Sequence, residues 1–464
     1  MIRPTFFAAV LTAAASGLSA ATPPRDPGPD SAQVARFLAG LATADPVICE
    51  MAVDNLGNGW SWHNRREPVG VLRDRTNSDR AARDVFSNQV EDPKALPLLV
   101  NHLGDQNPCV RRAAARMLGA HRGEMARQML RAKLRDAQPV VREAAALGVG
   151  EHDDHGAYDD LVRGLRDADL YVARMSAWAL GELSDRRAVP SLAALLENAD
   201  EGIRAAAVWA LGAIEDSRAV PGLLKRLEDR APGVRELTAD ALGDIESKAA
   251  TSALIAVLND PDIGVRRAAV RALSNIDDPS SAPAIARLLS SDDEELKKEA
   301  VHALGELQDT RSLAGLSRAL NDRSAEVRAE AAWALGQLED ARAAGALADA
   351  IKDPDPQVRR NAIDAIGDLE DLNKAPAPLV AALTDPDDEI RAAAAQALSQ
   401  IQDPATTAAL GRALQDDAVE VRRHVVEALA EMQNSSVEPF LLTAMKDADP
   451  EVRRRAAEAL GDRN

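Results

Sequence analysis

Apolar and polar positions along this chain repeat with a fixed period of 31 residues. Each unit carries an apolar marker that an Arg usually follows, a Leu at most of the positions eight residues later, and often a Gly after that. Successive markers are 31 residues apart, except for one step of 32 from Val358 to Ile390. A fixed period of this length predicts stacked supersecondary units rather than one globular core. The markers are Val110, Val141, Val172, Ile203, Val234, Val265, Leu296, Val327, Val358, Ile390, Val421 and Val452.

Residues 185–211 illustrate one unit, in which the spacing predicts two helices. The stretch 190–196 has leucines at helical spacing and begins with a proline, which is tolerated in the first turn of a helix. The stretch 203–211 again collects its apolar residues on one face. Gly212 follows and predicts the C-terminal end of the second helix. The pair would form an antiparallel hairpin whose apolar faces need neighbouring hairpins for cover.

A column of Asp stands five residues before the marker, and a column of Arg stands one residue after it. Asn198 and Ser291 interrupt the first column, and Ala173 and Lys297 the second. A short acceptor in the turn and a planar cation on the next helix predict pairing within a layer and with the layer beside it. Ten equivalent copies indicate a structural rather than a catalytic role. We take as representative members of this ladder Asp260, Arg266, Asp322, Arg328, Asp353 and Arg359.

The repeat has the pattern D-P-x-x-x-V-R-x-A-A-x-x-A-L-G-x-[LI]-x-D-x-R-A-[VL]-P, which is clearest at 203–221, 260–276 and 353–369. This pattern resembles the short HEAT repeat of the type found in phycobilisome lyase subunits, and it is similar to artificial HEAT-like scaffolds built for binding. Tetratricopeptide and ankyrin patterns are absent. The resemblance implies an all-α fold, a right-handed α-solenoid of about 14 helical hairpins. It also implies that the second helix of each pair lines the concave face.

The chain divides into four segments. Residues 1–20 predict a signal peptide for secretion, because a positive start, an apolar stretch and small residues follow one another. The apolar stretch is too short to span a bilayer, and an uncleaved N-terminal anchor is the alternative interpretation. Residues 21–30 predict a flexible segment, 31–104 divergent N-terminal capping repeats, and 105–464 the regular HEAT-like array.

The stretch 57–75 departs most from the repeat pattern and holds Trp60 and Trp62. One interpretation is a recognition loop specific to this protein. The other is a plug over the open end of the solenoid, which we favour because a repeat array needs caps.

The chain has two cysteines, Cys49 and Cys109. Export would permit a disulfide between them. The repeat period argues against it, because Cys49 lies two periods before Cys109 and stacked helices are about 8–10 Å apart. The irregular sequence between the two positions leaves the bond open.

Six residues after each marker, the residue type varies instead of staying small and apolar, which indicates a column that faces solvent. The resemblance places this column on the concave face. Ten residues after the marker lies a second column, mostly acidic or amide, whose members Glu182, Asp244 and Glu306 are predicted to contact and select a basic partner. The variable column reads Arg116, Leu147, Trp178, Trp209, Asp240, Arg271, His302, Trp333, Asp364, Gln396, Glu427 and Glu458.

Four members of the variable column are predicted partner contacts: Trp178, Trp209, His302 and Trp333. Exposed aromatic side chains on an inner wall are typical anchors for protein partners. Trp178 and Trp209 lie in adjacent layers, so their rings would be about 8–10 Å apart. The alternative is that each indole lies flat over the alanine-rich seam and adds to the core.

The net charge of −19 disfavours nucleic acid and anionic membranes and favours a basic partner. The cluster His152-Asp-Asp-His155 has the composition of a metal site. It occupies an exposed turn with no third strong ligand fixed nearby, so we predict no metal there. The sequence has no phosphate loop, nucleophile elbow or cofactor motif.

The sequence therefore predicts an exported, non-enzymatic interaction scaffold, periplasmic or extracellular and monomeric, that binds a protein or peptide along its concave face. Two alternatives stay open. One is a regulatory subunit acting on a membrane or secreted peptidase, since similar repeats are fused to membrane-bound peptidases. The other is a lyase-like or enzyme-assisting subunit, which the bilin-lyase relatives of the repeat imply.

Overall fold

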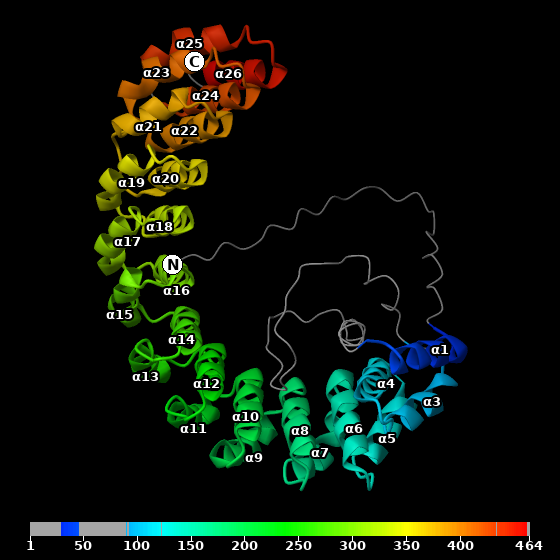
Figure 1. Ribbon diagram of the computed structural model, residues 1–464. Helices are drawn as coiled ribbons and strands as arrows, with labels where there is room; N and C mark the ends of the chain where they lie inside the picture. The colour runs from blue at the N-terminus through cyan, green and yellow to red at the C-terminus, as the bar shows by residue number, and fades with distance from the viewer. Residues whose placement is uncertain (1–28, 46–89, 91, 122, 433, 462–464) are drawn as a thin grey trace.

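The structure, a computed structural model, describes residues 29–45, 90, 92–121, 123–432 and 434–461. Within these ranges the chain forms helices and turns and no β-strand. Figure 1 shows helical hairpins stacked side by side along an open arc, with the C-terminal helices at the end far from α1 (Ser31–Ala42). The all-α solenoid predicted from the 31-residue period is confirmed.

Each layer consists of a shorter helix on the outside of the arc and a longer helix on the inside (Figure 1). The outer helices are α3 (Ala95–His102), α5 (Glu124–Lys133), α7 (Tyr158–Gly164), α9 (Val189–Ala193), α11 (Val220–Arg226), α13 (Thr251–Val257), α15 (Ala282–Ile285), α17 (Leu313–Ala319), α19 (Ala344–Ala350), α21 (Ala377–Ala381), α23 (Thr407–Ala413) and α25 (Glu438–Ala444). The inner helices are α4 (Pro108–Ala120), α6 (Pro139–His152), α8 (Leu170–Glu182), α10 (Glu201–Ile214), α12 (Pro232–Asp244), α14 (Ile263–Ile276), α16 (Glu294–Glu306), α18 (Ala325–Gln337), α20 (Pro356–Asp368), α22 (Asp388–Ile401), α24 (Val419–Glu431) and α26 (Pro450–Gly461). Short 3₁₀ turns flank the outer helices, from η1 (His155–Ala157) to η12 (Ser435–Val437).

One apolar core runs along the whole array, because each inner helix packs against the inner helices before and after it. The residue eight positions after the marker is fully buried in successive layers, as Leu180, Leu211 and Leu242 show. The small alanines around it let neighbouring helices approach closely. Each layer therefore depends on both neighbours for the burial of its apolar face, as expected of a solenoid.

The prediction that Gly212 ends the second helix is wrong. Helix α10 continues through Gly212 to Ile214. A Cβ atom on Gly212 would lie 2.8 Å from Cβ and 2.9 Å from Cα of Ala241 on the next inner helix. The glycine is present because two helix backbones approach each other there, and the equivalent Gly181 and Gly243 meet Ala210 and Ala272 in the same way.

Non-glycine residues take the left-handed conformation after the inner helices. Glu215 has φ 53°, Glu246 has φ 53° and Gln308 has φ 47°, and no glycine in the described ranges has a positive φ. A side chain in this conformation costs about 1–2 kcal/mol because its Cβ crowds the following carbonyl oxygen. Among the residues that the structure describes, nine positions carry this cost.

We expect Glu246→Gly to stabilise the protein. Glycine removes the steric cost at φ 53° and adds entropy to the unfolded chain, so the gain is a net of about 0.5–1 kcal/mol. Chemical denaturation of the variant beside the wild type measures it. A Glu246→Ala control keeps a Cβ and removes the carboxylate; a gain as large in this control would mean that the charge, not the backbone, is responsible.

The expectation against a disulfide at Cys109 is wrong. Cys109 is disulfide-bonded, and Cys49, outside the described residues, is the other cysteine of the sequence. The argument from the period failed because it assumed two regular layers between them. Helix α1 instead packs directly against α3 and α4, and Asn107 Nδ2 donates to the carbonyl oxygen of Ala42 at 3.3 Å. The chain that leads to Cys49 thus leaves α1 beside the start of α4.

Several N-terminal predictions lie outside the described residues. These are the signal peptide at 1–20, most of the flexible segment at 21–30, and the stretch 57–75 with Trp60 and Trp62. Helix α1 starts at Ser31, where Asp30 and Gln33 form a capping box. In the ranges that the structure describes, no helix has the length and apolar character to cross a membrane.

Candidate protein-binding face

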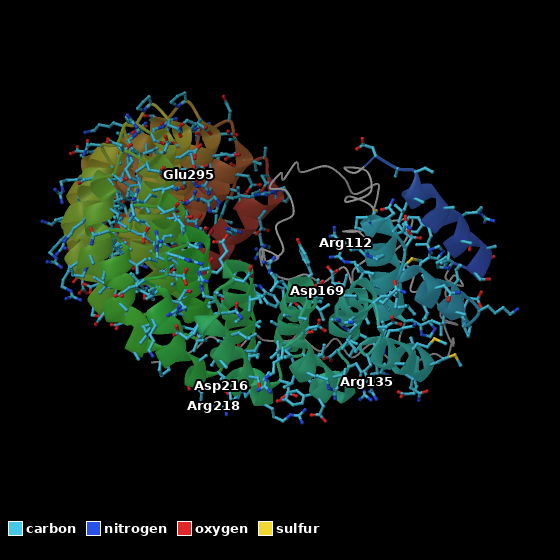
Figure 2. The ribbon with its side chains drawn as sticks, turned by 60° about the horizontal axis from the view of Figure 1, so that its bottom comes forward. Arg112, Arg135, Asp169, Asp216, Arg218 and Glu295 are labelled. Atoms are coloured by element: carbon cyan, nitrogen blue, oxygen red, sulfur yellow. The ribbon has the colours of Figure 1, made fainter. Side chains whose placement is uncertain are left out.

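The inner helices expose one side along the inside of the arc, which we call the concave face. On α16, the exposed residues Glu295, His302 and Glu306 lie at helical spacing, while Leu296 and Leu304 between them are buried. Figure 2 labels Arg112, Asp169 and Glu295 at the inner helices, and Arg135, Asp216 and Arg218 on the opposite, outer side. The concave face is therefore formed by the exposed positions of the inner helices from α4 to α26.

The variable column is only partly exposed. Its first four members, Arg116, Leu147, Trp178 and Trp209, are buried, so the expectation that the whole column faces solvent is wrong. From α12 onward its members are half-buried or exposed. These are Asp240, Arg271, His302, Trp333, Asp364, Gln396, Glu427 and Glu458.

Trp178 and Trp209 belong to the core. Each is 8 % exposed, and their rings stack with centroids 6.3 Å apart and an interplanar angle of 21°. The rings lie closer together than the predicted helix spacing because each indole extends over the glycine of the layer before it. A Cβ on Gly150 would lie 2.5 Å from a ring carbon of Trp178, and one on Gly181 2.7 Å from a ring carbon of Trp209. The two indoles thus have the packing role that we considered as the alternative.

His302 and Trp333 form a second ring stack, with centroids 4.9 Å apart and planes 14° from parallel. Here the side chain of His302 is 55 % exposed and Trp333 is half-buried. His302 Nδ1 lies 2.8 Å from Glu330 Oε1, and His302 Nε2 lies 3.9 Å from Glu306 Oε1. We call these four residues the His302 cluster. It combines a flat ring surface with two carboxylates on the concave face.

Glu330 was missed in the sequence because it belongs to neither column. It stands three residues after its marker, 28 residues beyond His302. The same 28-residue step joins Arg271 to Glu299 and Glu427 to Arg455. This spacing between complementary polar residues is the signal that would have revealed it.

The acidic column lies on the concave face as well. Glu182, Asp244 and Glu306 are exposed at the C-terminal ends of α8, α12 and α16. Near the end of α20, desolvation and repulsion from Asp364 raise the pKa of Asp368. A cation that approaches such a carboxylate stabilises its charged form.

The Asp–Arg ladder joins layers on both sides of each turn. Arg328 Nη1 donates to the carbonyl oxygen of Asp322 in its own layer at 2.9 Å. Its Nε and Nη2 bind the carboxylate of Asp353 in the next layer at 2.7 and 2.8 Å. Asp353 Oδ1 also accepts the backbone N–H of Asp355 at 2.9 Å and so fixes the turn. Bidentate pairs of the same kind join Arg142 to Asp167, Arg204 to Asp229, Arg235 to Asp260, Arg391 to Asp416 and Arg422 to Asp447.

Where another residue replaces an Asp or Arg of the ladder, the bidentate pair between layers is lost or becomes a single contact. Arg266 donates to the carbonyl oxygen of Asp260 at 2.7 Å, but the next layer offers Ser291 in place of an Asp. Lys297 binds Asp322 through its single ammonium group. Arg359, which has an Asp in the next layer, places Nε 3.1 Å from Asp385 Oδ2. These side chains join neighbouring layers and turns, which is a structural role.

The ladder predicts a loss of stability in acid. The Arg328 guanidinium holds the pKa of Asp353 below its usual value. Because the folded pKa lies below the unfolded one near about 3.9, this stabilisation is present above about pH 4 and is lost as the pH falls through the folded pKa. We expect Asp353→Asn to destabilise the protein at pH 7 and to approach the wild type below pH 4. Urea denaturation between pH 7 and 3 tests this; a difference that stays constant would show that the charge of Asp353 is not the cause.

The cluster at His152–His155 has structural contacts. Asp154 is buried and accepts a bidentate pair of bonds from Arg131, with Nε–Oδ2 at 2.6 Å. His152 Nδ1 lies 2.8 Å from the carbonyl oxygen of Gly119. Among the described residues no group of three or more potential ligands is arranged to hold a metal ion.

Solved structures with a TM-score above 0.5 to this chain share its solenoid fold. Structures similar to the chain include Kap95p bound to RanGDP, with a TM-score of 0.53 and 16% identity over 93% of this chain and 77% of that one. Yeast importin-β (Kap95p) gives a TM-score of 0.51 and 15% identity over 93% and 68%. The CpcE–CpcF complex of phycocyanin lyase from Nostoc sp. PCC7120 gives a TM-score of 0.33 and 24% identity over 50% and 91%.

No curated protein matches the chain in sequence. The profile of HEAT repeats matches residues 75–150, 96–175, 158–243, 220–295, 282–366, 346–424 and 409–464, which together cover most of the chain. The suspected repeat type is thereby confirmed. The 31-residue hairpins, the inner and outer rows of helices and this match lead to one conclusion: the chain belongs to the HEAT-repeat family.

Proposed function

We propose that this protein is an exported, non-enzymatic scaffold that binds a basic protein or peptide along its concave face. The observation that supports this most is the exposed, acidic inner surface from α12 to α26. Glu306, Asp368 and Glu431 are exposed there. Other carboxylates of the same face are paired with arginines of this chain, as Asp240 is with Arg271 and Glu427 with Arg455. The carboxylates that are left in excess attract and orient a partner of the opposite sign.

The shape of the molecule supports the same proposal. A solenoid presents an extended concave surface that a single globular domain does not offer. The Kap95p structure shows a solenoid of this general fold with RanGDP bound. At 16% identity the likeness concerns the fold, so the chemistry of the partner follows from the side chains of this chain alone.

Export rests on the sequence of residues 1–20. The test is the mass of the mature chain recovered from its own organism, together with the compartment in which it is found. Loss of about twenty N-terminal residues in an exported fraction supports the proposal. An intact chain inside the cell contradicts it.

The binding function is tested by capture with matched variants of the tagged full chain. Asp368→Lys with Glu431→Lys reverses charge on the concave face, and Glu228→Lys with Asp349→Lys reverses the same charge at exposed outer positions. We expect the partner to be lost from the inner variant and kept by the outer one. If the inner variant keeps its partner, the concave face is not the binding surface.

Two other roles would use the same surface. A regulatory subunit would capture a peptidase, and an enzyme-assisting subunit would capture an enzyme with its substrate or pigment. The identity of the captured protein therefore separates these two roles from a scaffold.

A further inference from the structure

The solenoid uses one position on its concave face to hold guanidinium groups. Arg271, six residues after its marker, places Nη2 3.0 Å from Asp240 Oδ1 and Nη1 3.4 Å from Glu299 Oε1. These two carboxylates belong to the layers before and after it. A guanidinium is planar and carries five donors, so it bridges two carboxylates that a smaller cation would not reach together.

The C-terminal layers also hold a guanidinium between two carboxylates, one on the preceding inner helix and one on the helix of the arginine itself. Glu427 occupies the position of Arg271 and binds Arg455 Nη1 at 2.7 Å. Arg455 Nε also binds Glu451 at 2.9 Å. A guanidinium lying between two carboxylates is thus a recurrent feature of the contact between inner helices.

The His302 cluster has one carboxylate on its own helix, Glu306, and one on the next inner helix, Glu330, without a guanidinium between them. Glu306 and Glu330 face the imidazole of His302, which is shorter than an Arg side chain and ends within the ring stack. The side chains of His302 and Glu306 are each 55 % exposed and that of Glu330 is 33 % exposed. The carboxylates and the ring surface are therefore accessible from the concave side.

We propose that the His302 cluster binds an arginine side chain of the basic partner. This inference rests on the proposed function and adds the residue type that the concave face selects. The guanidinium lies flat against the ring stack of His302 and Trp333 and donates to Glu306 and Glu330. Arginine is preferred to lysine because its planar group both stacks and makes paired hydrogen bonds.

The charge around the cluster favours the same occupant. Asp364 and Asp368 stand one layer further along the concave face, and repulsion from Asp364 helps raise the pKa of Asp368. The nearest cations of this stretch are already paired, Lys298 with Glu295 and Glu326, and Arg360 with Asp364. A partner segment with several arginines therefore meets Asp368 one layer beyond the His302 cluster, beside the paired Asp364.

The test measures binding of a fluorescent peptide of alternating Gly and Arg to the full chain by anisotropy at physiological salt. Citrulline and lysine versions of the peptide are the probes for charge and for planarity. We expect the double variant Glu306→Gln with Glu330→Gln to raise the Kd for the arginine peptide about tenfold. His302→Arg should raise this Kd by a similar factor, because it places a permanent guanidinium between the carboxylates as Arg271 does.

The control is Glu431→Gln with Glu458→Gln, which removes two exposed carboxylates from the same face and should change Kd less than about twofold. The citrulline peptide should bind weakly to every variant. Equal loss in the site variant and the control overturns the proposal, because it reduces the effect to net charge. Equal affinity for the lysine and arginine peptides overturns the preference for arginine.

The two proposals fail in different ways. If the captured partner depends on Asp368 and Glu431 but the peptide does not depend on the His302 cluster, the arginine site is wrong and the concave binding face stands. If both the captured partner and the peptide ignore the inner substitutions, the proposed function itself fails.

Discussion

Replacing Gly243 by Ala is expected to lower the free energy of unfolding by about 1–3 kcal/mol, although Ala is the better helix former. A Cβ on Gly243 would lie 2.7 Å from Cα and 3.0 Å from Cβ of Ala272. The atoms that it meets include the backbone of α14, which cannot rotate away as a side chain can. Helices α12 and α14 must therefore move apart along their contact.

Gly345→Ala is the matched control for this substitution. Gly345 lies within the outer helix α19, and nothing lies within 4 Å of the Cβ that alanine would add. There the same change should stabilise the protein by about 0.5–1 kcal/mol, because it improves helix propensity and restricts the unfolded chain. Only Gly243 has a neighbouring helix in the way of the added methyl group, so the two substitutions should have effects of opposite sign.

Urea denaturation, monitored by circular dichroism, measures the free energy of unfolding of both variants. In an array whose stability comes from contacts between neighbours, weakening one central contact should also broaden or split the transition. The interpretation of the glycine column as a set of close helix approaches is contradicted if Gly243→Ala is as stable as the wild type.

The fold could be predicted because a period repeated over the array averages out local errors. The two apolar faces and the Asp and Arg columns recur in most layers, so an exception such as Ser291 changes little. What failed was the interpretation of single residues that have two physical uses. Gly212 looked like the end of a helix, whereas it is a place where backbones meet.

The same ambiguity governed the candidate site. Trp178, Trp209 and Trp333 occupy one column, yet the first two are buried and the third is half-buried. All three indoles lie over the glycine of the preceding layer, and a Cβ on Gly305 would lie 2.8 Å from a ring carbon of Trp333. Residue type at a repeat position therefore does not reveal exposure. Glu330 was missed for the opposite reason, since it contacts His302 across a layer boundary that no single repeat shows.

The disulfide at Cys109 was misjudged because the period was extended beyond the regular array. Helix α1 packs against α4 without the regular layers that counting assumes. Counting by the period therefore fails between α1 and α4, where the described helices do not follow the regular order of layers.

Breaking the ion pair between Arg204 and Asp229 is expected to cause the second large loss of stability. This is the most deeply buried pair of the ladder, with side chains 5 % and 3 % exposed. Arg204 Nε and Nη2 bind the two carboxylate oxygens at 2.7 and 2.8 Å, and Nη1 donates to the carbonyl oxygens of Asn198 and Ala199. Every part of this guanidinium is therefore committed to protein acceptors in place of water.

Asp229→Ala should cost about 3–5 kcal/mol, because it leaves the Arg204 charge buried without its counter-ion. Asp340→Ala is the control, because Asp340 pairs with Arg342, whose side chain is largely exposed. Removing the Asp340 carboxylate should cost about 1 kcal/mol, mostly because Asp340 also caps the turn that begins at Ala341. The double variant Arg204→Met with Asp229→Leu removes both charges and should lose much less than Asp229→Ala alone. Denaturation of the four proteins completes the comparison. A double variant as unstable as Asp229→Ala would show that the layers need the pair itself, and not only the absence of an unpaired charge, to stay in contact.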